Sequence, residues 1–192
     1  QSDSRIFRDL NLSLYCVIII YRNGEPLAVS TPVDTVWADP RKLAQHPQEF
    51  ARLAKALDRD KNWLARRVTS NLDREFVYLV RHMRPADAAK VKALGISGVD
   101  TLREYRRYYP AGEVTGHLLG FTNVDDVGQE GLELAFDQWL GGEPGIKRVM
   151  RDREGRTIED IERIKAPRPG HDLLTSIDLR VQYLAYRAHK QA

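Results

Sequence analysis

The 192-residue chain has a single cysteine, Cys16, which excludes an internal disulfide and a zinc site built from several cysteines. Aromatic residues are also scarce, at 8% of the chain against 30% charged residues, which indicates an open fold with much surface. The longest apolar run, residues 14–21, is far shorter than the roughly 20 residues that span a bilayer. No signal peptide is visible, so the sequence by itself indicates a soluble chain.

Charge of either sign is also not in large excess. The 30 Lys and Arg are interspersed with 27 Asp and Glu, which leaves a net charge of +3 and a pI near 9.0. A nucleic-acid-binding protein needs a denser basic surface, so no nucleic-acid partner is expected. The mild positive bias would suit a protein partner or an anionic cell-wall surface.

Local signals predict short strands and helices along the chain. Asn23-Gly24 is a typical hairpin turn between two strand-like runs, 14–21 and 26–38. Further strands are predicted at 76–81, 99–109 and 173–177 and further helices at 47–57, 62–69, 85–94, 112–119 and 179–190, the last with Asp178 as N-cap. A 3.6-residue period predicts one amphipathic helix whose apolar face carries Leu132, Ala135, Phe136, Trp139 and Leu140.

Together these elements predict an α+β fold. We expect an elongated module of two lobes, with a small α/β head at residues 39–109. The second lobe would be a stalk of antiparallel strands and a hairpin with short helices. Its strands would come from residues 1–38, and its helix and hairpin part from residues 110–175.

The sharpest block of candidate site residues consists of Arg106, Arg107, Tyr108, Tyr109, Pro110 and Gly112. Two adjacent guanidinium groups can bind a carboxylate in a fork geometry, and Glu130, a partner domain or another protein could supply that carboxylate. The alternative, which we favour, is a strand end where the tyrosine rings pack and the arginines bind nearby carbonyl groups.

A second group, Glu113, His117, Asp125, Asp126 and Glu130, is compatible with metal binding or acid–base chemistry. A metallohydrolase needs a second histidine close by, as in His-Glu-x-x-His, and none is present. We therefore favour His117 as a capping or packing residue and the two aspartates as turn and cap residues. No catalytic residue, metal or cofactor is predicted.

A hairpin with arms 146–151 and 156–161 is predicted to carry opposite charges on its two strands. Cross-strand ion pairing explains these charges, and a docking edge for a neighbouring domain is the alternative. The residues concerned are Arg151, Arg153 and Arg156 on one side and Glu159, Asp160 and Glu162 on the other. Among the tryptophans, Trp37 and Trp63 are expected at the core boundary, and Trp139 is expected to pack inward.

The run Arg-Arg-Tyr-Tyr-Pro-Ala-Gly-Glu-Val-Thr-Gly-His-Leu-Leu-Gly-Phe-Thr-Asn-Val-Asp, residues 106–125, resembles the non-catalytic N-terminal module of class B penicillin-binding proteins. The resemblance is strongest to the division-specific peptidoglycan D,D-transpeptidase. Further matching pieces lie at 22–38, 74–80, 128–131, 136–140, 151–160 and 176–178. The family has Arg-Gly before the first hairpin and Asp-Arg-Asn-Gly within it, where this chain has Cys16-Val17 and Tyr21-Arg22-Asn23-Gly24.

The resemblance implies a pedestal, or dimerisation-type, domain on the periplasmic side of the bacterial inner membrane. Its implied partners are its own transpeptidase domain, for which residues 176–192 would be the lead-in, and division proteins that include a glycan-polymerising glycosyltransferase. A homodimer is possible, and membrane attachment would come only from an N-terminal anchor outside this chain. The head is the favoured partner surface, and the hairpin and C-terminal helix are expected to face the transpeptidase domain.

The acylating chemistry of the family requires Ser-x-x-Lys, Ser-x-Asn and Lys-Thr/Ser-Gly elements. None of the seven serines is followed by Lys three residues later, and no Lys-Thr-Gly or Lys-Ser-Gly occurs. The chain by itself is therefore not expected to react with a β-lactam. Two other hypotheses stay open: a metal-dependent hydrolase using Glu113, His117 and Asp125, and a module that binds anionic glycan.

Overall fold

The computed structural model describes residues 6–12, 17–143, 145–151, 157–166 and 168–191. These residues form two compact units, each made of three chain segments. Unit 1 comes from Gln1–Leu10, Pro32–Glu104 and Lys147–Ile164, and unit 2 from Asn11–Thr31, Tyr105–Ile146 and Lys165–Ala192. Helices and an open mixed sheet occur together, which confirms the predicted α+β class. No helix in the described ranges is both long and apolar enough to cross a membrane.

The main sheet has five strands, in the order β4-β3-β2-β8, and β5 also pairs with β3. Strands β3 (Pro26–Ala38) and β5 (Val99–Tyr108) each contribute residues to both units. The C-terminal end of β3 pairs antiparallel with β4 (Val77–Met83) in unit 1, with Trp37 opposite Tyr78. These positions confirm the strands predicted at 26–38, 76–81 and 99–109.

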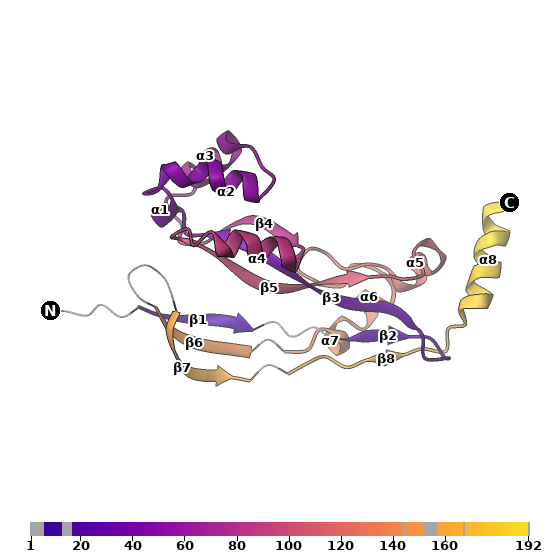
Figure 1. Cartoon of the computed structure of the whole chain (residues 1–192). Coiled ribbons are helices and arrows are strands. Elements are labelled where there is room, and N and C mark those ends of the chain that lie inside the picture. The colour runs from indigo at the N-terminus through magenta and orange to yellow at the C-terminus, as the bar shows by residue number, and fades with distance from the viewer. Residues whose placement is uncertain (1–5, 13–16, 144, 152–156, 167, 192) are drawn as a thin grey trace. The chain divides into compact units, whose positions relative to one another are not determined.

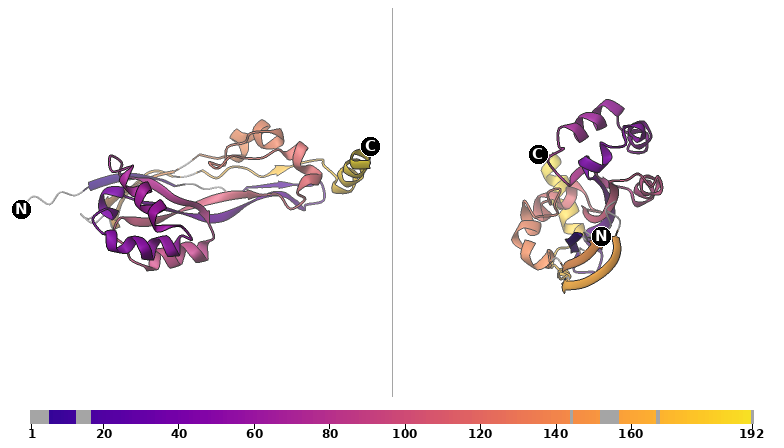
Figure 2. Two further views of the ribbon diagram at one scale, coloured as in Figure 1. Left: turned by 90° about the horizontal axis from the view of Figure 1, so that it is seen from above. Right: turned by 90° about the vertical axis from the view of Figure 1, so that its left-hand side faces the viewer.

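The helices of unit 1 lie together beside its part of the main sheet and pack on one another (Figure 1, Figure 2). Asp60 is the N-cap of α3, because its Oδ1 accepts hydrogen bonds from the backbone N–H groups of Asn62, at 2.7 Å, and Trp63, at 3.2 Å. Leu64 and Val68 of the same helix are buried in the core. The helices of this unit are α1 (Pro40–Leu43), η1 (Pro47–Glu49), α2 (Phe50–Ala56), α3 (Lys61–Thr69) and α4 (Pro85–Ala93).

A separate three-stranded sheet has the order β1-β6-β7, from β1 (Ile6–Leu12), β6 (Gly145–Arg151) and β7 (Thr157–Lys165). The adjacency of β6 and β7 confirms the predicted arms of the second hairpin. Residues 152–156, and with them Arg153 and Arg156, lie outside the described ranges. The side chains of Arg151 and Asp160 are not described either, so the cross-strand ion pairs stay a prediction.

Unit 2 has a short strand, β2 (Ile18–Ile20), that is paired on both sides. It runs antiparallel to β3, with Ile18 opposite Val29, and parallel to β8 (Leu173–Leu174). Gly24, at φ +88°, forms the predicted turn between β2 and β3. Val17 and Tyr21, at positions where the chain departs from the family motif, are each 3% exposed and belong to the core of this unit. Within the apolar run, Ile18–Ile20 therefore form an interior strand of the sheet.

The helices of unit 2 are α5 (Glu113–Leu119), α6 (Gly131–Ala135), α7 (Asp137–Leu140) and α8 (Leu179–Gln191). Asp178 precedes α8 as predicted, and its Oδ1 accepts a hydrogen bond from the backbone N–H of Arg180 at 3.0 Å. Hydrogen bonding to Arg180 lowers the pKa of Asp178 to about 2. Leu179 packs against the core cluster of unit 2.

The prediction of one amphipathic helix around Trp139 is wrong. The segment is two short helices that are separated at Phe136, whose φ of −115° is not helical. Trp139 is 51% exposed instead of packing inward, and its Nε1 donates a hydrogen bond to the carbonyl oxygen of Asp172. The predicted apolar face does not turn inward because Glu133, a charged residue on the same segment, takes the interior position and is 2% exposed.

Close backbone contact between α5 and α6 predicts unequal effects for two glycines. A Cβ at Gly120, which has φ +72°, would lie 1.9 Å from the carbonyl oxygen of Glu130, whereas a Cβ at Gly116 would meet nothing within 4 Å. We expect Gly120→Ala to lower the free energy of unfolding by about 3 kcal/mol, from left-handed strain and overpacking. Gly116→Ala, inside α5, should raise it by about 0.5 kcal/mol. Urea denaturation measures both changes, and equal midpoints for the two variants would contradict this packing.

Candidate functional site: a buried arginine cluster

The centre of unit 2 is a buried ion pair between Arg107 and Glu133, whose side chains are 3% and 2% exposed. The Nε of Arg107 lies 2.9 Å from Oε1 of Glu133, and its Nη2 lies 3.4 Å from Oε2. Two parallel N–H groups therefore meet the two carboxylate oxygens. This fork geometry is the strongest arrangement available to an arginine and a carboxylate.

The remaining nitrogen of the guanidinium group, Nη1, binds residues of two further chain segments. Nη1 of Arg107 donates to the backbone oxygen of Val17, at 2.5 Å, and to Oγ of Ser30, at 3.0 Å. Val17 directly precedes β2 and Ser30 is in β3, while Arg107 itself is near the end of β5. One side chain thus connects residues of three chain segments to α6.

Tyr109 and Asp126 lie against this ion pair. Burial raises the pKa of Tyr109 well above its usual value, and the negative charge of Glu133 adds to the rise. Burial also raises the pKa of Asp126 to about 6, with the carboxylates of Glu133 and Asp137 adding to the rise. A hydrogen bond from Thr122 and the charge of Arg107 act in the opposite direction for Asp126.

The structure separates the two adjacent arginines. Successive side chains of a strand point to opposite faces, so Arg107 is buried and Arg106 is exposed. The carbonyl group of Arg106 accepts a hydrogen bond from Oγ1 of Thr31 at 3.1 Å. Glu133 supplies the carboxylate, whereas Glu130 is exposed. Whether Arg106, Glu130 and the other candidates bind a partner stays a prediction.

Tyr109 and Gly112 form the turn that follows β5. Tyr109 packs on the core cluster, and its carbonyl oxygen accepts a hydrogen bond from the N–H of Gly112 at 3.0 Å. Gly112 has φ +50°, a conformation that favours glycine. Both residues therefore have a structural part in holding the end of β5 against α5.

The residues considered for metal or acid–base chemistry do not form a site. Within the described ranges, no group of three or more His, Cys, Asp or Glu side chains gathers as a metal site would require. Glu113 instead accepts a hydrogen bond from the hydroxyl of Tyr186 at 2.5 Å, which lowers the pKa of Glu113. His117 is exposed rather than packed, and Asp125 and Asp126 are in a turn organised by Asn123.

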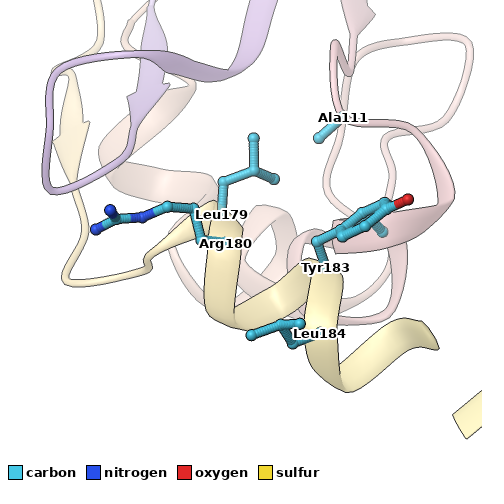
Figure 3. Close-up of a pocket in the computed structure, with 6 residues that line it drawn as sticks. Ala111, Leu179, Arg180, Tyr183 and Leu184 are labelled. Carbon is cyan, nitrogen blue, oxygen red and sulfur yellow. The ribbon is translucent and has the colours of Figure 1, made fainter. Parts of the chain in front are cut away.

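A pocket of about 470 Å³ lies between α5 and α8, both within unit 2. Its lining is apolar apart from Arg180, and Figure 3 shows Leu179 and Tyr183 projecting from α8 toward the segment that carries Ala111. The same helix exposes Val181, Tyr183 and Leu184 at 60%, 51% and 65%. The pocket and this helix face together form an apolar surface on unit 2.

Unit 1 has a polar cluster of its own around Glu104, which the sequence analysis did not single out. Nη2 of Arg81 lies 2.7 Å from Oε1 of Glu104, and the hydroxyl of Thr35 donates to the same carboxylate. Close by, Nε of Arg103 lies 2.5 Å from Oδ1 of Asp34. These pairs join β3, β4 and β5 across the sheet of unit 1.

A family model described as the penicillin-binding protein dimerisation domain matches residues 18–175. The chain belongs to this family. Over 192 residues it is 43% identical to the probable peptidoglycan D,D-transpeptidase PbpC of Pseudomonas aeruginosa, with 100% of the chain and 34% of that protein covered. It is also 43% identical to the peptidoglycan D,D-transpeptidase FtsI of Escherichia coli K12, with 97% and 32% covered. The chain thus spans about a third of the length of these relatives.

Solved structures agree with the fold of this dimerisation domain. The complex between penicillin-binding protein PBP2 and MreC from Helicobacter pylori matches with a TM-score of 0.71 and 21% identity, covering 97% of this chain and 39% of that chain. A peptidoglycan synthetase from Bifidobacterium adolescentis matches with a TM-score of 0.62 and 23% identity, covering 95% and 38%. Identities this low support the shared fold and nothing more.

The buried pair predicts a large difference between two nearby glutamates. Glu133→Gln removes the carboxylate that is paired with the buried guanidinium of Arg107 and should lower the free energy of unfolding by about 3–5 kcal/mol. The matched control Glu130→Gln changes an exposed side chain and should cost less than about 0.5 kcal/mol. Guanidinium denaturation of both variants measures the difference.

A double variant shows whether the stability lost in Glu133→Gln comes from the missing contact or from the unpaired buried charge. Arg107→Met with Glu133→Leu removes both charges at similar volume, so its stability should lie closer to the original chain than that of Glu133→Gln does. A double variant that is less stable than Glu133→Gln would show that the hydrogen bonds to Val17 and Ser30 matter more than the charges.

Proposed function

We propose that the dimerisation domain is the non-catalytic pedestal of a septal peptidoglycan D,D-transpeptidase, which it holds on the periplasmic side of the inner membrane. Membership of the family and 43% identity to two transpeptidases support this proposal. The acylating serine and its partner motifs would belong to another part of the protein, because the elements Ser-x-x-Lys and Lys-Thr/Ser-Gly are absent from this sequence. The role of the chain would then be mechanical and associative.

The observation that carries the proposal is the apolar surface on α8 and its pocket. Val181, Tyr183 and Leu184 are large apolar side chains that a free-standing domain would bury, and contiguous patches of this kind mark interaction sites. The sequence of this segment resembles the family's lead-in to the transpeptidase domain. We therefore assign the α8 surface to docking of the transpeptidase domain.

Residues 39–109 are the proposed surface for other partners. This region has a hydrophobic core of its own, built from α2, α3, α4 and the strands around Val36, so it can present a rigid outer face. The Helicobacter pylori protein of the same fold was solved as a complex with MreC, which supports a partner-binding role. For this chain we propose division proteins, including a glycan-polymerising glycosyltransferase, as the partners.

The α8 surface can be tested by adding the transpeptidase domain of the Pseudomonas aeruginosa relative to this chain. Light scattering coupled to size-exclusion chromatography should show a monomer that forms a 1:1 complex with the added domain. Leu184→Glu should weaken this complex at least tenfold, because burying a leucine contributes about 1.5–3 kcal/mol and 1.4 kcal/mol is a factor of ten. Calorimetric titration measures the affinity.

Gln191→Glu is the matched control, since it places the same charge on the exposed end of α8 outside the pocket lining. It should leave the affinity unchanged within a factor of two or so. Equal weakening by the two variants would show a nonspecific charge effect. A stable homodimer that ignores the added domain would contradict the docking role and favour self-association as the main property.

A further inference from the structure

The segment 121–129 of unit 2 is a tight loop closed by its own backbone. The N–H of Gln129 donates to the carbonyl oxygen of Phe121 at 2.8 Å, and the N–H of Asn123 donates to that of Val127 at 2.9 Å. The side-chain oxygen of Asn123 accepts from the N–H groups of Asp125 and Val127, at 2.9 and 3.0 Å. The loop thus has a defined conformation.

At the tip of this loop, Asp126 adopts a left-handed conformation with φ +62°. Its Oδ1 is buried and has no hydrogen-bond donor among the described residues. A buried carboxyl oxygen without a hydrogen-bond donor costs desolvation free energy, whereas the left-handed backbone is one that aspartate tolerates. Something in the environment has to compensate for this placement.

The groups that face Asp126 do not supply a free counter-charge. From its own loop it meets Thr122, from the end of β5 Arg107, from α6 Glu133 and from α7 Asp137. All three nitrogens of the Arg107 guanidinium are engaged by Glu133, Val17 and Ser30. The cluster therefore has three carboxyl groups for one guanidinium group.

Asp137 is engaged as well. Its Oδ1 accepts a hydrogen bond at 2.7 Å from the N–H of Gly128, in the same loop. An ionised Asp126 would face the negative charges of Glu133 and Asp137 in a poorly hydrated position. The neutral acid avoids this repulsion, and opening the loop avoids it by returning the carboxylate to water.

The outer side of the loop is apolar. Phe121, Val124 and Val127 are 49%, 51% and 44% exposed, so the loop presents three large apolar side chains to its surroundings. Their arrangement depends on the closed loop. A change at Asp126 therefore reaches an exposed surface of unit 2.

We propose that loop 121–129 is a proton-gated element of unit 2, closed when Asp126 is protonated and loosened when Asp126 loses its proton to water. The exposed apolar side chains of the loop are then held in a fixed arrangement in mild acid and become mobile as the solution turns neutral. This inference concerns the chain's own dynamics and holds whether or not the pedestal role does.

The direction of the pH effect on the loop follows from the direction in which the pKa of Asp126 is shifted. Burial raises the pKa of Asp126 from 3.8 to about 6, so the closed loop favours the protonated form. The stabilisation is fully present below the unfolded value of 3.8 and is lost as the pH rises through about 6.

Hydrogen exchange of the loop amides tests the proposal. After correction for intrinsic exchange, the amides of Asn123, Gly128 and Gln129 should lose protection by up to roughly tenfold between pH 5 and pH 7.5, because this window contains about half of the logarithmic change that a two-unit pKa shift produces. Asp126→Asn is neutral at every pH and tolerates the left-handed conformation, so it should keep protection at both pH values. Asp125→Asn, at the exposed neighbouring position, should behave like the original chain.

Protection that does not change with pH in the original chain would overturn the proposal, as would loss of the pH dependence in Asp125→Asn. If Asp126→Asn does not fold, an NMR titration of the Asp126 carboxyl carbon in the original chain decides the matter. An apparent pKa near 6 that tracks the loop amide signals supports the gate. A value near the ordinary 3.8, or loop signals that do not follow the titration, rejects it.

Discussion

The architecture of unit 2 depends on one requirement, that the guanidinium group of Arg107 be fully satisfied in a place that water does not reach. Glu133 neutralises its charge, and Val17 and Ser30 accept from its remaining nitrogen. These partners come from distant parts of the chain, so the cluster forms only when β2, β3, β5 and α6 are all in place. A buried ion pair of this kind adds little net stability but penalises any arrangement that leaves one charge unpaired. Its main effect is to select one packing of the unit.

This requirement also explains where the sequence pattern failed. The apolar spacing of Leu132, Phe136 and Trp139 suggested that these residues face the core, but Glu133 takes the interior position because its charge is needed there. A charged residue in an amphipathic pattern normally marks the solvent side, and no local feature distinguishes Glu133 from the exposed Glu130. Strand alternation does distinguish Arg107 from Arg106, but which of the two faces inward depends on the register of the sheet.

Turns, caps and helix starts depend on a few neighbouring residues, and these features could be predicted from the sequence. The hairpin at Asn23-Gly24, the cap residue Asp178 and the helix that begins at Pro85 all follow from the conformations and hydrogen bonds of single residues. Most helix and strand positions were therefore predictable. Two lobes were predicted, but the grouping of Lys147–Ile164 with Pro32–Glu104 in one unit was not, since it rests on contacts between residues far apart in sequence.

Close backbone contacts give the same region its second constraint. A Cβ at Gly120 would lie 1.9 Å from Glu130, and one at Gly131 would lie 2.5 Å from Leu119, so α5 and α6 meet backbone against backbone. Only glycine, which has no Cβ, permits this close approach. A rigid interior and an apolar surface on α8 are compatible with the proposed pedestal, which would hold a catalytic domain in place and carry out no reaction itself. Asp126 faces the same ion pair, so the proton gate that we propose for its loop would act directly beside this rigid core.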